Sequence, residues 1–129
     1  MFTYKPITLK LARRTTYLYH LTSVVNMLQM VSDGSIKGNL PSELAGLMML
    51  LSAQDKAKTK QIYFFRSLHR TFGLKRKAQC YLKIRVKDNE KLLKLLENSL
   101  YRRIDDALII ETESLLLSEL NYEIINIRD

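Results

Sequence analysis

The clearest pattern in the chain is a strict alternation of apolar and other residues over residues 79–86. One side of this segment carries Cys80, Leu82, Ile84 and Val86, and the other carries Tyr81, Lys83 and Arg85. Successive side chains of a strand point to opposite faces of a sheet, so the pattern predicts a half-buried strand. Its place among the apolar positions predicts that Cys80 is a small buried hydrophobe and not a nucleophile.

Four further segments are rich in β-branched, aromatic or aliphatic residues and also predict strands. They are residues 15–20, residues 61–65, and the two closing segments 107–110 and 122–127. Helix signals come mostly earlier in the chain, as capping or turn residues around an apolar pattern. They mark residues 24–32, between Thr22 or Ser23 and Asp33-Gly34; residues 41–58, opened by Pro41; and the segment after Asp88-Asn89, with Leu92, Leu93, Leu95 and Leu96 inward. Helices early and strands late predict the α+β class.

The length of 129 residues fits one domain, and we divide the chain into a basic arm over residues 1–14 and a single domain over residues 15–129. There are 21 Lys and Arg residues against 13 Asp and Glu residues, which gives a net charge of +8. That charge favours an anionic partner, such as nucleic acid or an acidic protein. The basic positions that we expect to recruit it include Arg70, Lys75, Arg76 and Lys77.

Several classes of protein are disfavoured by what the sequence lacks. A single cysteine excludes a disulfide framework, and two histidines with one cysteine argue against a catalytic metal site. Neither glycine-rich phosphate-binding motif, G-x-G-x-x-G or G-x-x-x-x-G-K-[ST], is present. No apolar run approaches the roughly 18–20 residues of a membrane span, and no apolar stretch of a secretory signal follows the first charges. We therefore expect a cytoplasmic protein.

Several segments, in this order, resemble the ADP-ribosyltransferase superfamily, which includes the poly(ADP-ribose) polymerases and diphtheria-toxin-type enzymes. Leu18-Tyr19-His20-Leu21-Thr22-Ser23, with the helix and glycine turn after it, is similar to the family's first strand, which reads roughly YHGTS. Residues 61–65 (QIYFF) look like the family's GIYF strand, and a serine-bearing turn follows. Residues 78–86 and the tail after residue 107 resemble the remaining strands. The resemblance covers roughly residues 17–127.

The resemblance implies a split β-sheet with helices packed on it, which clamps NAD in its cleft. His20, helped by Thr22 or Ser23, would hydrogen-bond the adenine-side ribose. Tyr63 and Phe72 would stack on the nicotinamide from opposite sides, since flat rings suit a flat cationic group. Arg66 would pair with the pyrophosphate, because Arg favours bidentate phosphate contacts.

The resemblance also implies a carboxylate that stabilises positive charge at the ribose carbon during transfer. The family's glutamate position falls nearest Asp106 or Ala107, so the glutamate itself is missing. Asp106 is the first candidate, and Glu111 and Glu113 lie further along. Two family glycines are also replaced, one by Leu21 and one by Gln61.

Each of these residues also has an ordinary structural interpretation. A lone histidine such as His20 is usually structural, and an aromatic strand such as residues 63–65 is usually core or cross-strand packing. Asp105-Asp106 after Arg102-Arg103 suits a surface ion-pair cluster, and Phe72 before Gly73 suits a helix-end contact.

Two functions follow as hypotheses. The first is an NAD-dependent ADP-ribosyltransferase-like protein that modifies a host protein or nucleic acid. The second is a catalytically degenerate member that binds or inhibits a host factor or nucleic acid. The missing glutamate and Leu21 favour the second. A compact basic protein of this kind is what we expect a phage or mobile element to encode against its host.

Overall fold

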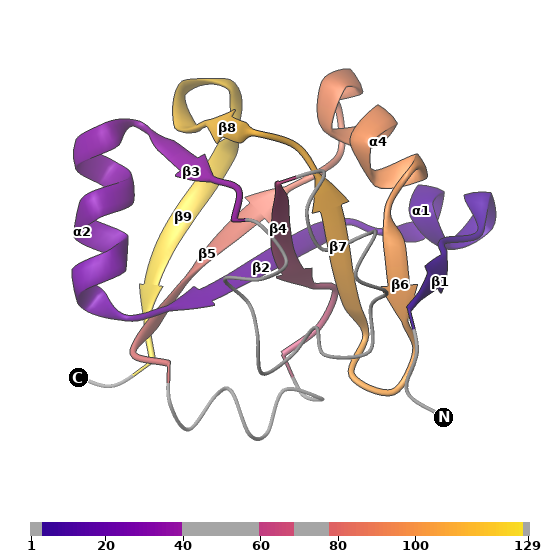
Figure 1. Ribbon diagram of the computed structural model, residues 1–129, viewed down its shortest axis with the longest axis horizontal. Helices are drawn as coiled ribbons and strands as arrows, with labels where there is room; N and C mark the ends of the chain where they lie inside the picture. The colour runs from indigo at the N-terminus through magenta and orange to yellow at the C-terminus, as the bar shows by residue number, and fades with distance from the viewer. Residues whose placement is uncertain (1–3, 40–59, 69–77, 128–129) are drawn as a thin grey trace.

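The computed structural model describes residues 4–39, 60–68 and 78–127 (Figure 1). Its elements in chain order are β1 (Lys5–Pro6), α1 (Leu9–Arg14), β2 (Tyr17–Thr22), α2 (Val24–Asp33), β3 (Ser35–Lys37), β4 (Gln61–Phe65), β5 (Cys80–Arg85), α4 (Glu90–Glu97), β6 (Leu100–Arg102), β7 (Ala107–Glu111), β8 (Ser114–Leu116), the 3₁₀ turn η2 (Leu117–Glu119) and β9 (Asn121–Asn126). Among the sequence predictions, the helix over residues 41–58 and residues Arg70, Phe72, Lys75, Arg76 and Lys77 lie outside the described residues.

The described strands form one seven-stranded sheet in the order β1-β6-β7-β4-β2-β5-β9 and one two-stranded sheet, β3-β8. Every pairing between these strands is antiparallel. The predicted α+β class is confirmed, because helices and a mostly antiparallel sheet occur in one chain without the regular alternation of βαβ units.

At the centre of the seven-stranded sheet, the neighbouring strands β2 and β4 share very little pairing. β2 pairs with β5 at six positions and β4 pairs with β7 at five, but β2 and β4 share only the pair Tyr19 and Phe65. Past that pair the two strands diverge, so the sheet consists of a β1-β6-β7-β4 block and a β2-β5-β9 block. Figure 1 shows β4 turned away from the direction of β2. The divergence leaves a wedge between the blocks.

The hydrophobic core lies on one face of this sheet. Leu18, Leu82 and Ile84 of the β2-β5 pair are fully buried there, as are Phe64, Leu108 and Ile110 of the β4-β7 pair. The described helices and the small sheet all cover this face, through Ala12 of α1, Met27 and Met30 of α2, Ile36 of β3, Leu92 and Leu96 of α4, and Leu115 of β8. Figure 1 shows α2 at one end of the sheet and α1 with α4 at the other.

The two longer helices begin and end where their sequences predict. The Ser23 hydroxyl accepts a hydrogen bond from the Asn26 N–H, which caps α2. Gly34 ends α2 in the left-handed region at φ +72°, where glycine is favoured, and its N–H donates to the Met30 carbonyl. Asn89 caps α4 in the same way, with its side-chain oxygen accepting from the Leu92 N–H.

Other features of the fold were not predicted. Residues 9–14, within the segment predicted as a basic arm, form α1, which Thr8 caps and which buries Ala12. The short strands β1, β3, β6 and β8 were also missed, because two or three residues carry no periodicity. In α2, the apolar residues at helical spacing do not form one buried stripe. Met27 is buried, whereas Val24, Leu28 and Val31 are 42%, 65% and 47% exposed.

In the described ranges, every helix falls short of the length and apolar character that a membrane span requires.

Gly38 follows β3 and packs against Thr112 and Glu113, which connect β7 to β8. A Cβ atom at Gly38 would lie 2.3 Å from the Thr112 carbonyl oxygen and 2.9 Å from Lys60 Cβ. We expect Gly38→Ala to lower the free energy of unfolding by about 3 kcal/mol, since backbone must move to make room. Gly34→Ala, which meets only open space and strains φ alone, should cost about 1 kcal/mol. Urea denaturation measures both; a loss in Gly38→Ala no larger than that in Gly34→Ala would contradict this prediction.

Candidate functional site

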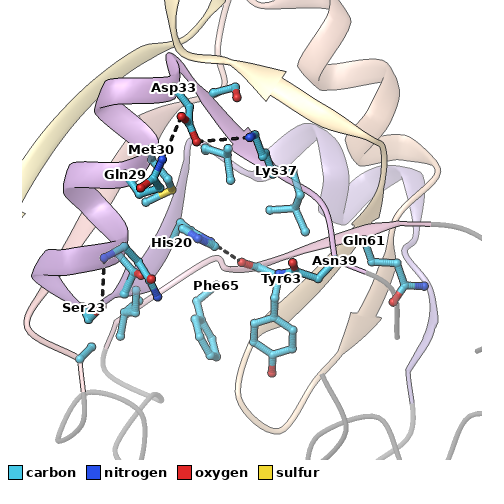
Figure 2. A pocket seen from close by; sticks show the side chains of 17 residues that line it. His20, Ser23, Gln29, Met30, Asp33, Lys37, Asn39, Gln61, Tyr63 and Phe65 are labelled. Carbon is cyan, nitrogen blue, oxygen red and sulfur yellow. Dashed lines mark hydrogen bonds and ion pairs between the residues drawn. The ribbon is translucent and has the colours of Figure 1, made fainter. Parts of the chain in front are cut away.

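A cavity of about 600 Å³ lies where β2 and β4 diverge (Figure 2). Its walls are the end of β2, one side of α2, the strand β3 and the strand β4 from Gln61 to Phe65. The volume falls within the range of typical small-molecule sites. The wedge between the two sheet blocks therefore produces a space that a small molecule could occupy.

The structure brings together four of the six residues that the resemblance assigned to NAD. His20, Thr22 and Ser23 line the cavity from the end of β2, and Tyr63 lines it from β4. Arg66 is not among the lining residues, and Phe72 lies outside the described residues. Leu21 and Gln61, which replace family glycines, are both in the cavity wall.

His20 fills a gap in the sheet hydrogen bonding. The Thr112 N–H donates to the Lys60 carbonyl and the Arg66 N–H donates to the Asp106 carbonyl, so the backbone polar groups of even-numbered β4 residues point toward β7. The backbone polar groups of odd-numbered residues therefore point toward β2. Because β2 has diverged at Tyr63, the His20 side chain takes its place, with Nδ1 at 2.9 Å from the Tyr63 carbonyl oxygen.

That contact fixes the chemical state of His20. A carbonyl oxygen can only accept, so Nδ1 carries the proton and donates it. Burial lowers the pKa of His20, against a smaller opposite effect of the hydrogen bond to Tyr63. The ring is therefore neutral at pH 7, with Nε2 left as a hydrogen-bond acceptor. A neutral acceptor beside the cavity suits a hydroxyl group of a ligand.

Tyr63 is held at one end of the cavity by contacts on its ring and its hydroxyl. Its ring meets Phe65 edge-to-face at 5.1 Å between centroids and Tyr4 at 6.3 Å. Arg102 donates to the Tyr63 hydroxyl at 2.8 Å, and Arg102 is itself ion-paired with Asp105. Burial raises the pKa of Tyr63, so the phenol stays protonated. Figure 2 shows the Tyr63 and Phe65 rings together on the side of His20 away from α2's C-terminal end.

α2 contributes a side of the cavity that sequence reasoning missed. Asn26, Gln29, Met30 and Asp33 all line it. Their spacing of i, i+3, i+4 and i+7 places them on one side of a helix, which was the available signal. Asp33 accepts from Gln29 at 2.9 Å and pairs with Lys37 at 3.3 Å. The Gln29 hydrogen bond and then Lys37 lower the pKa of Asp33, so it stays ionised.

Gln61 closes the other side of the cavity at the start of β4. Its backbone N–H and carbonyl bond Asn39 at 2.8 and 2.9 Å, which continues the sheet across the open end of the wedge. Its side chain is 5% exposed, and its Oε1 has no hydrogen-bond partner among the described residues. The amide thus occupies the space that a glycine at this position would leave open.

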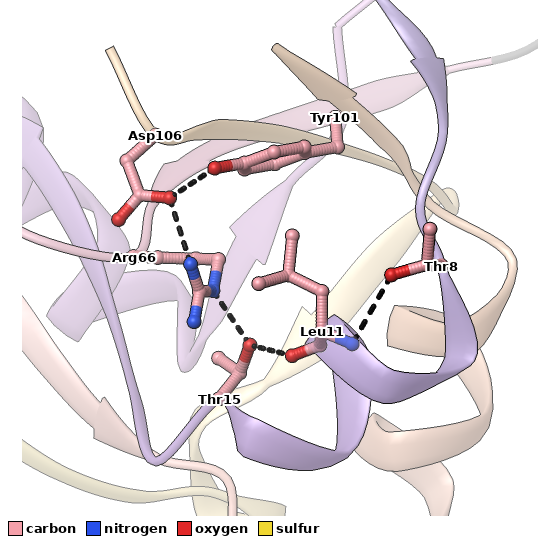
Figure 3. Close-up of polar contacts among 6 residues, drawn as sticks. All are labelled: Thr8, Leu11, Thr15, Arg66, Tyr101 and Asp106. Atoms are coloured by element: carbon pink, nitrogen blue, oxygen red, sulfur yellow. Dashed lines mark hydrogen bonds and ion pairs between the residues drawn. The ribbon is translucent and has the colours of Figure 1, made fainter. Parts of the chain in front are cut away.

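The two carboxylates predicted for chemistry lie outside this cavity. Asp106 accepts from Arg66 at 2.8 Å and from the Tyr101 hydroxyl at 2.5 Å, and Arg66 also donates to Thr15 at 2.7 Å (Figure 3). Burial disfavours the ionised form of Asp106, but Tyr101 and Arg66 outweigh it, so its pKa lies below the usual range. Glu111 is exposed at the end of β7, opposite Gln61 in the register, and does not line the cavity.

Arg66, Asp106 and Thr15 form a structural clamp at the closed end of the wedge. Thr15 precedes β2, Arg66 follows β4 and Asp106 precedes β7, so their contacts tie both sheet blocks together. Asp106 also adopts φ +56°, a left-handed conformation that aspartate tolerates better than most residues. Cys80 is 1% exposed, as the alternation predicted, and burial raises the pKa of its thiol.

This chain matches none of the protein-family models, curated proteins or solved structures with which it was compared.

His20 makes the stability of the protein depend on pH. Its pKa in the folded state lies below the ordinary value of 6.5, so below that pH the unfolded chain binds a proton that the folded protein does not. We therefore expect the contribution of His20 to stability to be full above about pH 6.5 and to fall as the pH drops below that value, by at most about 1.4 kcal/mol per unit. Urea denaturation across this range measures it.

His20→Asn keeps a donor near the Nδ1 position and should flatten that dependence. The chain's other histidine, His69, provides the matched control, because His69→Asn removes the same kind of group elsewhere. Equal pH dependence in the wild type and in His20→Asn would show that His20 is protonated as readily in the folded state as in the unfolded chain.

Asp106→Asn should destabilise the protein by about 3 kcal/mol, because it leaves the Arg66 guanidinium buried without its counter-charge. The Arg66 and Asp106 side chains are only 17% and 12% exposed. Glu119→Gln is the matched control, since the Lys91–Glu119 pair is 67% and 47% exposed and should contribute under about 1 kcal/mol. Chemical denaturation near neutral pH compares them; similar losses in both variants would exclude a structural clamp.

Proposed function

We propose that this protein is ADP-ribosyltransferase-like and binds NAD in the cavity between β2 and β4. One observation carries the proposal: four residues assigned to NAD by the resemblance, from two separate segments of the chain, line one cavity. The His20 ring also hydrogen-bonds the backbone carbonyl of Tyr63, 43 residues away, which joins the two segments directly. The near-separation of the sheet into two blocks also supports the split β-sheet that the resemblance implies.

The cavity residues suit the parts of an NAD molecule. His20 Nε2 is available to accept from a ribose hydroxyl. The Ser23 oxygen caps α2, but its hydroxyl hydrogen remains free to donate, and Thr22 lies beside it. The fixed Tyr63 ring provides a flat surface for the nicotinamide. Lys37, rather than the clamped Arg66, is the cation that lines the cavity among the described residues, and we assign the phosphates to it.

Bound NAD would supply the ADP-ribosyl group, but the cavity provides little to catalyse its transfer. Asp33 is the one carboxylate that lines the cavity among the described residues. Figure 2 shows it at the C-terminal end of α2, with His20 between it and Tyr63. A carboxylate there is remote from the predicted nicotinamide end, where positive charge would develop. Asp105 reaches the Tyr63 hydroxyl at 3.4 Å, but Arg102 holds it.

This placement favours the second function, a catalytically degenerate member that binds NAD and acts by binding a partner. The partner would be an acidic macromolecule, either a host protein or a nucleic acid, because the net charge of the chain is +8. In the enzymatic alternative the same protein transfers ADP-ribose to that partner, and Asp33, Asp106 or Glu111 would have to reach the ribose. For the binding form, the setting that we propose is phage counter-defence.

Calorimetric titration with NAD tests the binding proposal. We expect saturable binding to the wild type, and at least about tenfold weaker binding in Tyr63→Ala and His20→Ala, since each removes a contact worth about 1.4 kcal/mol. Tyr63→Phe keeps the ring and should retain binding. Leu28→Ala, on the outward side of α2, is the control. Absence of a heat signal at millimolar NAD would refute the proposal.

Release of nicotinamide from NAD separates the two functions. A degenerate binder retains bound NAD intact, and its Asp33→Asn variant behaves like the wild type. An enzyme releases nicotinamide at a rate that falls in one of the carboxylate variants Asp33→Asn, Asp106→Asn or Glu111→Gln.

A further inference from the structure

The face of the β2-β5 pair opposite the core carries a cluster of tyrosines and cations. Odd-numbered residues of β2 and β5 point to this face, because their even-numbered neighbours enter the core. The register places Tyr17 opposite Arg85, Tyr19 opposite Lys83 and Leu21 opposite Tyr81. We call Tyr17, Tyr19, Tyr81, Lys83 and Arg85 the tyrosine face. Three aromatic rings and two cations thus occupy one small area of sheet.

This face remains partly open to solvent. The three tyrosines and Lys83 are half-buried, and Arg85 is exposed. The described helices contribute their buried residues to the core on the other side of the sheet. A half-buried tyrosine on this face, which the described helices leave to the other side of the sheet, has its ring orientation set by neighbours while part of its surface stays accessible.

The Tyr19 and Tyr81 rings do not stack face to face, so they do not cover each other's faces completely. Tyr19 and Tyr81 meet at 72° with centroids 5.7 Å apart, so one ring of the pair keeps both faces free of the other. The Lys83 ammonium lies 4.4 Å from the centre of the Tyr17 ring. A planar base can stack on such a ring while the adjacent ammonium contacts its phosphate.

Cations and carboxylates both lie around this face. Lys83 and Arg85 lie on it, and exposed Lys87 follows β5. Glu123 is opposite Lys83 in the β5-β9 register, and Asp88, Glu90 and Glu119 line one surface hollow with Arg85 and Lys87, so Lys83 beside the tyrosine rings is the cation best placed for a phosphate. The overall charge of +8 adds a long-range attraction for polyanions.

We propose that the tyrosine face binds single-stranded nucleic acid, with bases stacked on the tyrosines and phosphates held by Lys83 and Arg85. Aromatic rings on an open sheet, flanked by cations, recognise unstacked bases and the backbone that joins them. A duplex keeps its bases stacked inside and offers only its phosphates. An acidic protein would use the cations but would leave the row of flat rings without a matching group. This inference does not require NAD to bind in the cavity.

Fluorescence anisotropy with a labelled oligothymidylate of about 15 nucleotides tests the proposal without NAD. We expect binding that weakens as salt rises, and binding at least about tenfold weaker to a duplex of the same length. The chain has seven tyrosines and no tryptophan, so quenching of its own tyrosine emission reports stacking directly. No binding of the single strand, or duplex binding of equal affinity, would overturn the proposal; the first outcome would leave an acidic protein as the partner.

Variants distinguish this face from general basicity. Lys83→Gln with Arg85→Gln should weaken binding at least about tenfold and reduce the salt slope by about 1.4, which corresponds to two phosphate contacts. Lys91→Gln with Lys94→Gln is the matched control, because it removes the same charge from α4, on the other side of the sheet. Equal effects in the two double variants would overturn the proposal.

Tyrosine variants test stacking in particular. Tyr19→Leu and Tyr81→Leu should each weaken binding about tenfold and reduce the quenching, with an unchanged salt slope. If either tyrosine variant fails to fold, the Lys83→Gln with Arg85→Gln variant still tests the proposal. Loss of binding only in Lys75→Gln with Arg76→Gln and Lys77→Gln, with the tyrosine face variants unaffected, would contradict it.

Discussion

β2 and β4 share one residue pair and then diverge, and the arrangement of this molecule depends on how that divergence is held. An antiparallel sheet normally satisfies the backbone polar groups of each strand with those of the next. Here the groups of β4 that face β2 find three different partners. Phe65 pairs with Tyr19, the Tyr63 carbonyl accepts from the His20 ring, and Gln61 bonds the backbone of Asn39. The first is the remaining pair with β2, and the other two replace backbone partners that β2 would have supplied, so the wedge can stay open.

The closed end of the wedge needs reinforcement for the same reason. A single backbone pair is a weak joint between two sheet blocks, and the Arg66 side chain adds a second one. It reaches Thr15 ahead of β2 and Asp106 ahead of β7, while the Arg66 N–H bonds the Asp106 carbonyl. Burial makes this ion pair costly to break from one side, although replacing the whole pair by apolar groups need not destabilise a protein. Arg66, assigned to phosphate by the resemblance, and Asp106, the first candidate for catalysis, are therefore occupied in holding the fold.

Sequence reasoning succeeded where the signal was local and failed where it was not. The alternation around Leu82, the caps at Ser23 and Asn89 and the turn at Gly34 are set by neighbouring residues, and each is found in the structure. The role of Asp106 depends on Arg66, 40 residues away, and no local pattern reports such a partner. The side of α2 that faces the cavity was readable in its spacing, but its polar residues suggested solvent. Which strands pair, and where a pairing stops, is decided by the packing of the whole sheet.

The cavity and the tyrosine face meet at the wedge, and this gives their two proposed ligands a physical connection. Leu21 and Phe65 line the cavity, yet both lie on the same sheet face as Tyr19. Leu21 is two residues after Tyr19 in β2, and Phe65 is the β4 residue that pairs with Tyr19. A ligand that changed the separation of β2 and β4 in the cavity would act on the Tyr19–Phe65 pair, and so on the tyrosine face. Thermodynamic linkage then requires the effect to be mutual: whatever factor a bound nucleotide applies to the affinity for a nucleic-acid strand, the strand applies to the nucleotide. The single Tyr19–Phe65 backbone pair is the one β2–β4 strand pairing in the described sheet, so any such coupling between the two proposed sites would have to act through it or through the Arg66 clamp beside it.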